Sequence, residues 1–450
     1  MALALEVHFR DEAGNSDFCV VTLLLQDNNS DVCDGTGSRI AGNVHTEEHE
    51  NIENVVVDLL GSNEFTSQEL TDVQGNYAFE GVGTDNDYVL TGSRDGHILN
   101  GISTLDILVM QRHILGAEFL PSAFKVIAAD VNNDGVITAI DLITLRKLIL
   151  GSISEFPNGQ TPWRFPNESQ TFLDALRPFP YTEDITVLDL NAPMTGQDFV
   201  GVKIGDVNAS AIVNTFNTDP ELEKRQNRSL SLVIQDQKLE AGQTVSIPVY
   251  AENMVDIAGF QYTLNFDAKA LTLVSVEPAG IDLDDSNIAF YNAANGSIAL
   301  SWNDLNGVTT DDQEQLFELV FEVNQNTSVA SNLFLNSGMT KAEAYTTELN
   351  ILDVELGLRG SDNTEFVVFQ NVPNPFSDNT EIQFTLPSEG AVTLSVFDLN
   401  GREILRQTNN YAKGNNTITL DSDQLQATSV MYYTLDSAYG TASKKMIQIR

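Results

Sequence analysis

The fold is decided first by residues 130–141, which read Asp130-Val-Asn-Asn-Asp-Gly-Val-Ile-Thr-Ala-Ile-Asp141. A calcium loop of the EF-hand type takes oxygen ligands from positions 1, 3, 5, 7, 9 and 12 and turns sharply at a glycine in position 6. Gly135 stands at that turn, and an oxygen donor stands at every ligand position. The expected Ca²⁺ ligands are Asp130, Asn132, Asp134, the Val136 carbonyl, Thr138 and Asp141.

The end of this loop also has the form of a helix start. Thr138-x-x-Asp141 is a capping box, so a helix is expected over 142–150, ended by Gly151. A capping box explains two loop residues but leaves the earlier Asp, Asn and Gly unexplained, so the sequence favours a metal loop. No apolar entering helix is expected before Asp130, and position 12 is Asp where calmodulin-type hands have Glu.

The loop and its helix are the second copy of an internal repeat. A shift of 35 residues lays Asp95 on Asp130, Asp106 on Asp141 and Gly116 on Gly151. The first copy lacks oxygen-bearing side chains at positions 3 and 5. One hypothesis is a split site, in which the later segment Gly205-Asp-Val-Asn208 supplies the missing ligands. The other hypothesis is that this segment forms an ordinary Asp-x-Asn turn. The split site would use Asp95, Asn100, Ser103, Asp106, Asp206 and Asn208.

Two loop-helix units in tandem, with Asp at position 12, resemble a dockerin over residues 95–151. This resemblance implies Ca²⁺ binding and a cohesin partner that is recognised through both repeats. The family's usual Ser-Thr contact pair is absent here. The implied partner-binding positions are Thr104, Leu105, Gln111, Arg112, Ala139, Ile140, Arg146 and Lys147.

The length and the net charge of the chain limit its domain organisation and its classes of partner. With 450 residues, the chain is expected to form several domains. Its 64 acidic and 23 basic residues give a net charge of −41, which argues against nucleic-acid binding and favours cation binding. No apolar run is long enough to span a bilayer, so no transmembrane segment is expected.

The amino-terminal residues 1–38 are expected to be the remnant of a truncated β domain, because the strand pattern begins at once and lacks a signal peptide. Cys19 and Cys33 are the only cysteines. They predict a disulfide if the protein is exported, unless either one pairs with a residue outside this sequence.

Residues 39–94 alternate in short strands and predict a small β-sandwich. Their spacing of Gly42, Gly75 and Tyr77 resembles carboxypeptidase regulatory-like or Cna-B-type domains, which implies a spacer. No lysine precedes Lys125, which excludes a Lys-Asn crosslink there. His45-Thr-Glu-Glu-His49 matches a zinc-protease pattern formally, but it lies between strands rather than on the helix that such a site requires.

The helical module is expected to extend over residues 95–210 through a Pro-rich β appendage, followed by a linker over 211–228. Residues 229–357 alternate through many strands and predict a two-sheet sandwich. The run from Gly242 to Val249 and the strand Ile257 to Asp267 resemble a cohesin jelly roll. Carbohydrate-binding modules share that fold, so Tyr262 and Trp302 are expected either to stack on sugars or to pack in the core.

Residues 365–450 open with Asn371-Val-Pro-Asn-Pro-Phe376 and end with Lys444-Lys-Met-Ile-Gln-Ile-Arg450. They resemble the type A sorting domain of the type IX secretion system found in Bacteroidota. The resemblance implies contact with that secretion machinery, and a secreted protein or one on the outer cell surface.

Together these features predict a mainly β protein of several sandwich modules with one small α-helical calcium module. No motif in the sequence indicates a catalytic site, so an enzyme is not expected. The leading hypothesis is a secreted or cell-surface scaffold or adhesion protein that binds cohesin-bearing or dockerin-bearing proteins in a Ca²⁺-dependent way. The alternative is an accessory component of extracellular polysaccharide breakdown that binds polysaccharide.

Overall fold

The computed structural model of the chain divides into two compact units, each described here by itself. The first unit spans residues 1–93, 165–170 and 182–201, and the second spans residues 94–164, 171–181 and 202–450. The structure describes residues 2–10, 16–24, 37–62, 64–96, 98–214, 225–252, 254–359, 366–371, 374–376, 379–398, 402–425 and 430–449. Cys33 lies outside the described residues, and so does the predicted disulfide.

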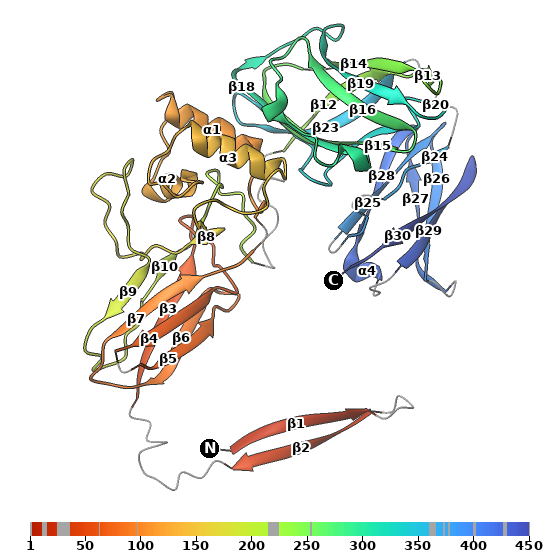
Figure 1. Cartoon of the computed structure of the whole chain (residues 1–450). Coiled ribbons are helices and arrows are strands. Elements are labelled where there is room, and N and C mark those ends of the chain that lie inside the picture. Colours follow the sequence, from red (N-terminus) through yellow and green to blue (C-terminus); the bar gives the residue numbers. More distant parts are fainter. Residues whose placement is uncertain are drawn as a thin grey trace. The chain divides into compact units, whose positions relative to one another are not determined.

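The first unit contains the expected small β-sandwich, preceded by a hairpin of β1 (Ala2–Arg10) and β2 (Ser16–Leu24). One sheet has the strand order β10-β3-β6 and the other has the order β5-β4-β7-β9 (Figure 1). Segments that follow the helices in sequence complete both sheets, since β10 pairs with β3 and β9 pairs with β7. The strands are β3 (Ser38–His45), β4 (Val56–Gly61), β5 (Thr66–Leu70), β6 (Asn76–Val82), β7 (Tyr88–Ser93), β9 (Asp184–Val187) and β10 (Phe199–Val200).

The second unit begins with the helical module, in which α1 (Thr104–Ile114) packs against α3 (Ala139–Ile149). A short ladder of β8 (Trp163–Arg164) and β11 (Val202–Lys203) joins the later segment to this module. The helix after the calcium loop starts at Ala139 rather than at residue 142, because Thr138 is its N-cap and the next three residues form its first turn.

The expectation that no helix enters the loop is wrong. Helix α2 (Ala123–Ala129) runs directly into Asp130, which is its C-cap. The helix has only seven residues, and its buried side chains are mostly small and consecutive, as in Val126 and Ile127 followed by two alanines. Such a segment has no helical apolar stripe, which explains why periodicity did not reveal it.

The large sandwich, residues 225–359, surrounds one apolar core. Its main sheet follows the order β16-β19-β14-β12-β23-β22-β15-β18-β17, with β21 paired to β15, and β13 pairs separately with β20 (Figure 1). The elements are β12 (Arg225–Gln235), β13 (Lys238–Leu239), β14 (Thr244–Glu252), β15 (Ile257–Phe266), β16 (Leu271–Pro278), η2 (Asp285–Asn287), β17 (Ile288–Ala289), η3 (Ala293–Asn295), β18 (Ser297–Val308), β19 (Gln315–Val323), β20 (Thr327–Ser328), β21 (Leu333–Asn336), β22 (Glu343–Thr346) and β23 (Ile351–Arg359).

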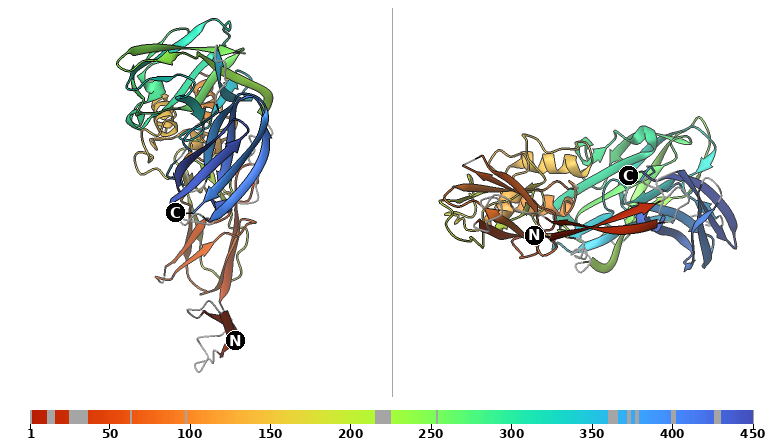
Figure 2. Two further views of the ribbon diagram at one scale, coloured as in Figure 1. Left: turned by 90° about the vertical axis from the view of Figure 1, so that its right-hand side faces the viewer. Right: turned by 90° about the horizontal axis from the view of Figure 1, so that it is seen from below.

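The C-terminal sandwich consists of two sheets, ordered β24-β25-β28 and β27-β26-β29-β30, whose strands are blue in Figure 2. Its core includes Phe376 from the Pro-Asn-Pro-Phe opening and Met446 from the Lys-Lys ending, so both sequence signatures lie in the packed domain. The elements are β24 (Val367–Val368), β25 (Asn379–Leu386), β26 (Gly390–Phe397), β27 (Glu403–Tyr411), β28 (Gly414–Asp421), α4 (Ser422–Leu425), β29 (Val430–Ser437) and β30 (Gly440–Ile447).

The core of the large sandwich makes a stability prediction. Phe321 is fully buried and its ring meets Phe266 edge to face, with centroids 5.1 Å apart. Replacing Phe321 with Ala should destabilise this domain by about 3–5 kcal/mol, because it leaves a cavity. Urea unfolding followed by the fluorescence of buried Trp302, in a Trp163→Phe background, measures the loss. Val274→Ala, on the exposed face of β16, should change stability by less than about 0.5 kcal/mol, and an equal loss would contradict this core assignment.

Candidate calcium loops and recognition interface

The contiguous loop is held in an ion-binding shape by the carboxylate of Asp130. Its Oδ1 accepts the N–H of Asp134 (3.0 Å), and its Oδ2 accepts the N–H of Gly135 (2.9 Å). Asn133 and Gly135 adopt positive φ angles of 57° and 80°, which turn the chain tightly around this carboxylate. Position 1 of the loop therefore organises positions 4 to 6.

The other end of the loop is closed by Asp141, which is fully buried. Its Oδ1 accepts the N–H of Asn132 (3.1 Å), and its Oδ2 accepts the N–H of Thr138 (2.8 Å) at the start of α3. Burial raises the pKa of Asp130 and of Asp141, and the carboxylates around each residue add to the rise. The loop thus brings together negative charge that a cation would neutralise.

The donor chemistry of this loop fits Ca²⁺, which prefers carboxylate, amide and carbonyl oxygens. The described residues include no group of three or more His, Cys, Asp or Glu side chains already arranged around one metal position. The Asn132 amide instead donates to Asp134 Oδ2 (2.8 Å). The loop's carboxylates would therefore draw together around an ion.

The segment around Asp206 repeats this geometry. Asp206 Oδ1 accepts the N–H of Ser210 (3.1 Å), and its Oδ2 accepts the N–H of Ala211 (2.9 Å). These donors lie four and five residues after the aspartate, as Asp134 and Gly135 do after Asp130. Ala209 has a φ of 60°, close to that of the equivalent Asn133. The segment has the backbone of the first half of a calcium loop.

The second half of that loop comes from the first repeat. Asp106 Oδ2 accepts the N–H of Ser103 (2.9 Å), as Asp141 does with Thr138, while its Oδ1 accepts the N–H of Val207 (2.9 Å). Asn100 exchanges two hydrogen bonds with the backbone of Ile212, at 2.8 and 2.9 Å. The sequence hypothesis that the later segment folds back onto the first repeat is thus matched by contacts. Asp95 is exposed.

Two further side chains define the electrostatics of this discontinuous loop. Both amide atoms of Asn208, the counterpart of Asn132, are buried and have no hydrogen-bond partner among the described residues. Lys203 is buried nearby, and its Nζ donates to the carbonyls of Ile98 (2.8 Å) and Ile204 (3.1 Å). Burial lowers the pKa of Lys203 to about 7, against the opposing effect of Asp206 and Asp106.

The residue that follows Ser103 begins the contact with the large sandwich. The backbone N–H and the hydroxyl of Thr104 both donate to Gln261 Oε1, at 2.7 and 2.8 Å. The same hydroxyl lies 2.7 Å from the hydroxyl of Ser301. Gln261 is on β15 and Ser301 is on β18, and all three side chains are buried. The start of α1 is therefore hydrogen-bonded to the face of a sheet.

A second polar group joins both helices to β18. Asn303 donates through Nδ2 to Gln111 Oε1 of α1 (2.6 Å) and accepts through Oδ1 from the Arg146 guanidinium of α3. Arg112 donates to the carbonyl of Thr347. Burial lowers the pKa of Arg146, and the carboxylate of Asp284 opposes that shift.

Apolar side chains surround these hydrogen bonds. Leu105 and Leu108 of α1 are buried in one cluster with Ala258, Tyr345 and Ile351 of the sandwich. A second cluster joins Leu150, after α3, to Ala289 and Ala299. The sequence did not single out Leu108 or Leu150, although Leu108 lies one helical turn after Thr104 and so shares its face.

Five of the eight positions that the dockerin resemblance implied for partner binding thus contact the large sandwich. They are Thr104, Leu105, Gln111, Arg112 and Arg146. Ala139, Ile140 and Lys147 of the second repeat are exposed, with Ile140 at 57%. The contact therefore uses the length of α1 in the first repeat and the end of α3 in the second, and it leaves the beginning of the second repeat open.

Tyr262 and Trp302 belong to the core rather than to a sugar-binding surface. Both are buried, Tyr262 stacks on Phe260, and the Trp302 indole donates to the carbonyl of Asp282 (2.9 Å). The core interpretation of these two residues is confirmed.

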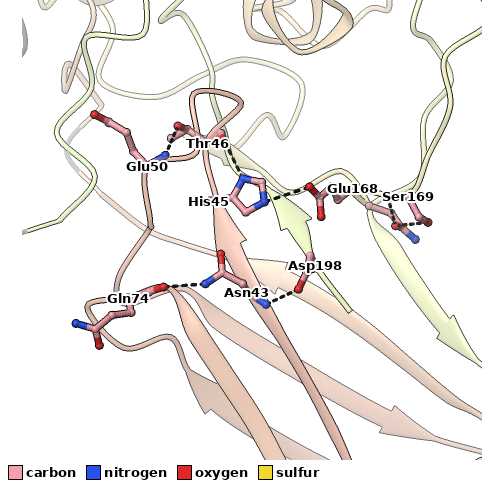
Figure 3. A network of polar contacts seen from close by, with 9 residues as sticks. Asn43, His45, Thr46, Glu50, Gln74, Glu168, Ser169 and Asp198 are labelled. Carbon is pink, nitrogen blue, oxygen red and sulfur yellow. Dashed lines mark hydrogen bonds and ion pairs between the residues drawn. The ribbon is translucent and has the colours of Figure 1, made fainter. Parts of the chain in front are cut away.

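The His45 motif lies in the small sandwich and is not helical. His45 ends β3, and its ring nitrogens lie 2.8 Å from the Thr46 carbonyl and 3.3 Å from Glu168 Oε1 (Figure 3). Asn43 of the same strand donates its N–H to Asp198 Oδ1 (2.7 Å). These contacts tie β3 to segments later in the sequence, which gives the motif a structural role.

Comparisons with known families agree with this geometry. Residues 100–150 match the Dockerin type I domain, and residues 230–353 match the Cohesin domain. Residues 372–449 match the Secretion system C-terminal sorting domain. The chain combines a dockerin, a cohesin and a sorting domain. The resemblance of residues 39–94 to carboxypeptidase regulatory-like domains stays a prediction.

Dockerin and cohesin domains bind cohesin-bearing and dockerin-bearing partners, and the sorting domain indicates export through the type IX machinery. Type I dockerins are EF-hand-like calcium-binding modules. None of the helices in the described ranges is long and apolar enough to cross a membrane.

Solved structures similar to this chain include a type I cohesin–dockerin complex from Clostridium thermocellum, with 14% identity, 29% of this chain and 99% of that chain covered, and a TM-score of 0.22. A cohesin from Pseudobacteroides cellulosolvens has 18% identity, 29% and 87% coverage, and a TM-score of 0.22. A non-cellulosomal cohesin from Archaeoglobus fulgidus has 15% identity, 29% and 87% coverage, and a TM-score of 0.19. No protein with a curated description matches the sequence.

Proposed function

We propose that this protein is a non-catalytic scaffold or adhesion protein, exported or held on the cell surface, that associates with other proteins in a Ca²⁺-dependent way through its dockerin and cohesin domains. The observation that carries the proposal is the buried contact of Thr104 with Gln261 and Ser301. It supports a recognition role for both surfaces, because the α1 residues that were expected to contact a cohesin lie against a sheet of the cohesin domain.

The polar character of this contact supports recognition rather than simple packing. A buried polar group that loses its partner costs about 1–3 kcal/mol, so a sheet bearing Gln261, Ser301 and Asn303 selects a surface that satisfies all three. The apolar residues Leu105 and Leu108 add burial around them. Affinity and selectivity thus come from different side chains.

Calcium would act through the fold of the dockerin domain. Asp130, Asn132, Asp134, the Val136 carbonyl, Thr138 and Asp141 would hold one ion and supply hard oxygen ligands to it. Because Asp141 also caps α3, an ion there would fix the start of the helix that carries Arg146.

The discontinuous loop would hold a second ion. Asp206, Asn208 and Asp106 would be its side-chain ligands, near Asn100 and Ser103. The repeated hydrogen bonds of the Asp206 carboxylate support this proposal, and the buried, unpartnered amide of Asn208 supports it independently. An ion at this position would lie beside the start of α1, where Thr104 contacts the cohesin domain.

The contiguous site predicts the loss of one Ca²⁺ equivalent in the Asp134→Ala variant. Asp134 is exposed, so its replacement should leave the calcium-free fold intact. Isothermal titration of the full chain with Ca²⁺ measures the number of ions bound. Glu277→Ala, which removes an exposed carboxylate from β16, should retain the wild-type number. Wild-type stoichiometry in Asp134→Ala would refute this ligand set.

The discontinuous site predicts an unusual pair of effects for Asn208→Ala. The Asn208 side chain makes no hydrogen bond within the part of the chain that the structure describes, so the melting temperature of the variant in EDTA should equal that of the wild type or exceed it slightly. In saturating Ca²⁺ it should lose one bound ion and part of the calcium-induced rise in melting temperature. If the wild-type chain binds one ion and the Asn208→Ala variant also binds one, only the contiguous site binds Ca²⁺ and the discontinuous site is refuted.

Calcium dependence of the contact predicts a local change in hydrogen exchange. In EDTA, backbone amides of α1 and of β15 around Gln261 should exchange faster than in Ca²⁺, because the helix start that carries Thr104 loses its support. Amides of β26 and β29 in the sorting domain serve as the internal control and should not change. Equal protection of α1 in both conditions would contradict a calcium-dependent association.

A further inference from the structure

The two recognition surfaces of this protein face each other within one chain. Thr104 of the dockerin is hydrogen-bonded to Gln261 and Ser301 of the cohesin, and Asn303 connects to Gln111 and Arg146. Resting on the proposed function, we propose that the protein is self-capped: its own dockerin occupies its own cohesin, and an outside partner must displace that contact before it can bind.

The burial of β15 supports this proposal. All ten of its residues, Ile257–Phe266, are buried, although one face of a sandwich strand normally meets water. The cohesin's own loop covers Thr263 through the N–H groups of Met339 and Thr340, and the dockerin covers the outward face around Gln261. Phe260 and Tyr262 point into the cohesin core, while Gln261 between them is covered by Thr104. An ideal Cβ built on Gly259 would lie 3.3 Å from Thr104 Cγ2, so the helix start approaches the backbone of the strand closely.

The apolar contacts that flank Thr104 distinguish the first repeat from the second. Leu108 is fully buried against cohesin residues that include Tyr345, whereas Ile143, its counterpart in the second repeat, is 51% exposed. The chain therefore uses the two halves of the repeat unequally. The whole of α1 lies against the cohesin, whereas the second repeat contacts it only through Arg146 and Leu150 and leaves the start of α3 exposed.

The short connection between the two domains favours the cap over an outside partner. Only residues 215–224 separate Asn214, the last described residue after the dockerin, from the first cohesin strand at Arg225. A short tether gives an effective concentration in the millimolar range. A partner of equal intrinsic affinity, present at micromolar concentration, is then at a disadvantage of about a thousandfold.

Two complementary variants of the full chain test the cap. Leu108→Arg places a charge in the contact and frees the cohesin, while Ser301→Arg blocks the cohesin and frees the dockerin. Each variant alone has one intact surface and should remain monomeric. Mixed in Ca²⁺ at micromolar concentration, the two should form a 1:1 complex that dissociates in EDTA, as followed by sedimentation velocity.

The wild-type chain should be monomeric and should bind each variant about a thousandfold more weakly than the variants bind each other. Ile143→Arg, which places the same charge on the exposed second repeat, should behave as the wild type. Circular dichroism and thermal melting verify that every variant is folded.

The possible failures are distinct. Wild-type chains that bind the variants as tightly as the variants bind each other would overturn self-capping but leave the proposed function intact. Wild-type dimers that Leu108→Arg dissociates would show exchange of the dockerin between copies and would also overturn it. If both folded variants fail to bind each other, the dockerin does not recognise the cohesin of this chain; self-capping is then overturned, and the proposed function loses the contact that carries it.

Discussion

The structure depends on one carboxylate at the third position of each main dockerin helix. Asp106 and Asp141 each accept the N–H of their own helix cap with one oxygen and a loop N–H with the other. Each side chain thereby fixes the helix start and attaches it to the segment that wraps around it. In the first repeat, that segment arrives from about a hundred residues later in the chain, at Val207.

Local patterns in the sequence predicted the parts of the site that are contiguous. The contiguous loop could be read directly, because its glycine and its donors follow one another within a short stretch. The discontinuous loop was only one of two hypotheses, since nothing local reveals that Asp206 returns to Asp106. Helix α2 was missed because its short run of small apolar residues has no periodicity. The family resemblance identified Thr104 and Arg146, but not which repeat would face the cohesin.

The two loops differ in how their charge is balanced. In the contiguous loop the charges that act on Asp141 come from other carboxylates, Asp130 and Asp134. In the discontinuous loop two carboxylates, Asp206 and Asp106, act on the buried amine of Lys203, whose pKa of about 7 leaves it partly protonated at neutral pH. Before any ion binds, the discontinuous loop is therefore closer to neutrality. A cation would gain less Coulomb energy there, and the two proposed sites should fill at different calcium concentrations.

The covered face of the cohesin sheet carries polar side chains, chiefly Gln261, Ser301 and Asn303. When a domain core opens, it exposes apolar surface, and the opened chain tends to aggregate. When this face opens, water can take the place of each lost hydrogen bond. Opening the contact therefore costs little at its polar centre, and the apolar surface that it exposes is confined to the small clusters around Leu108 and Leu150.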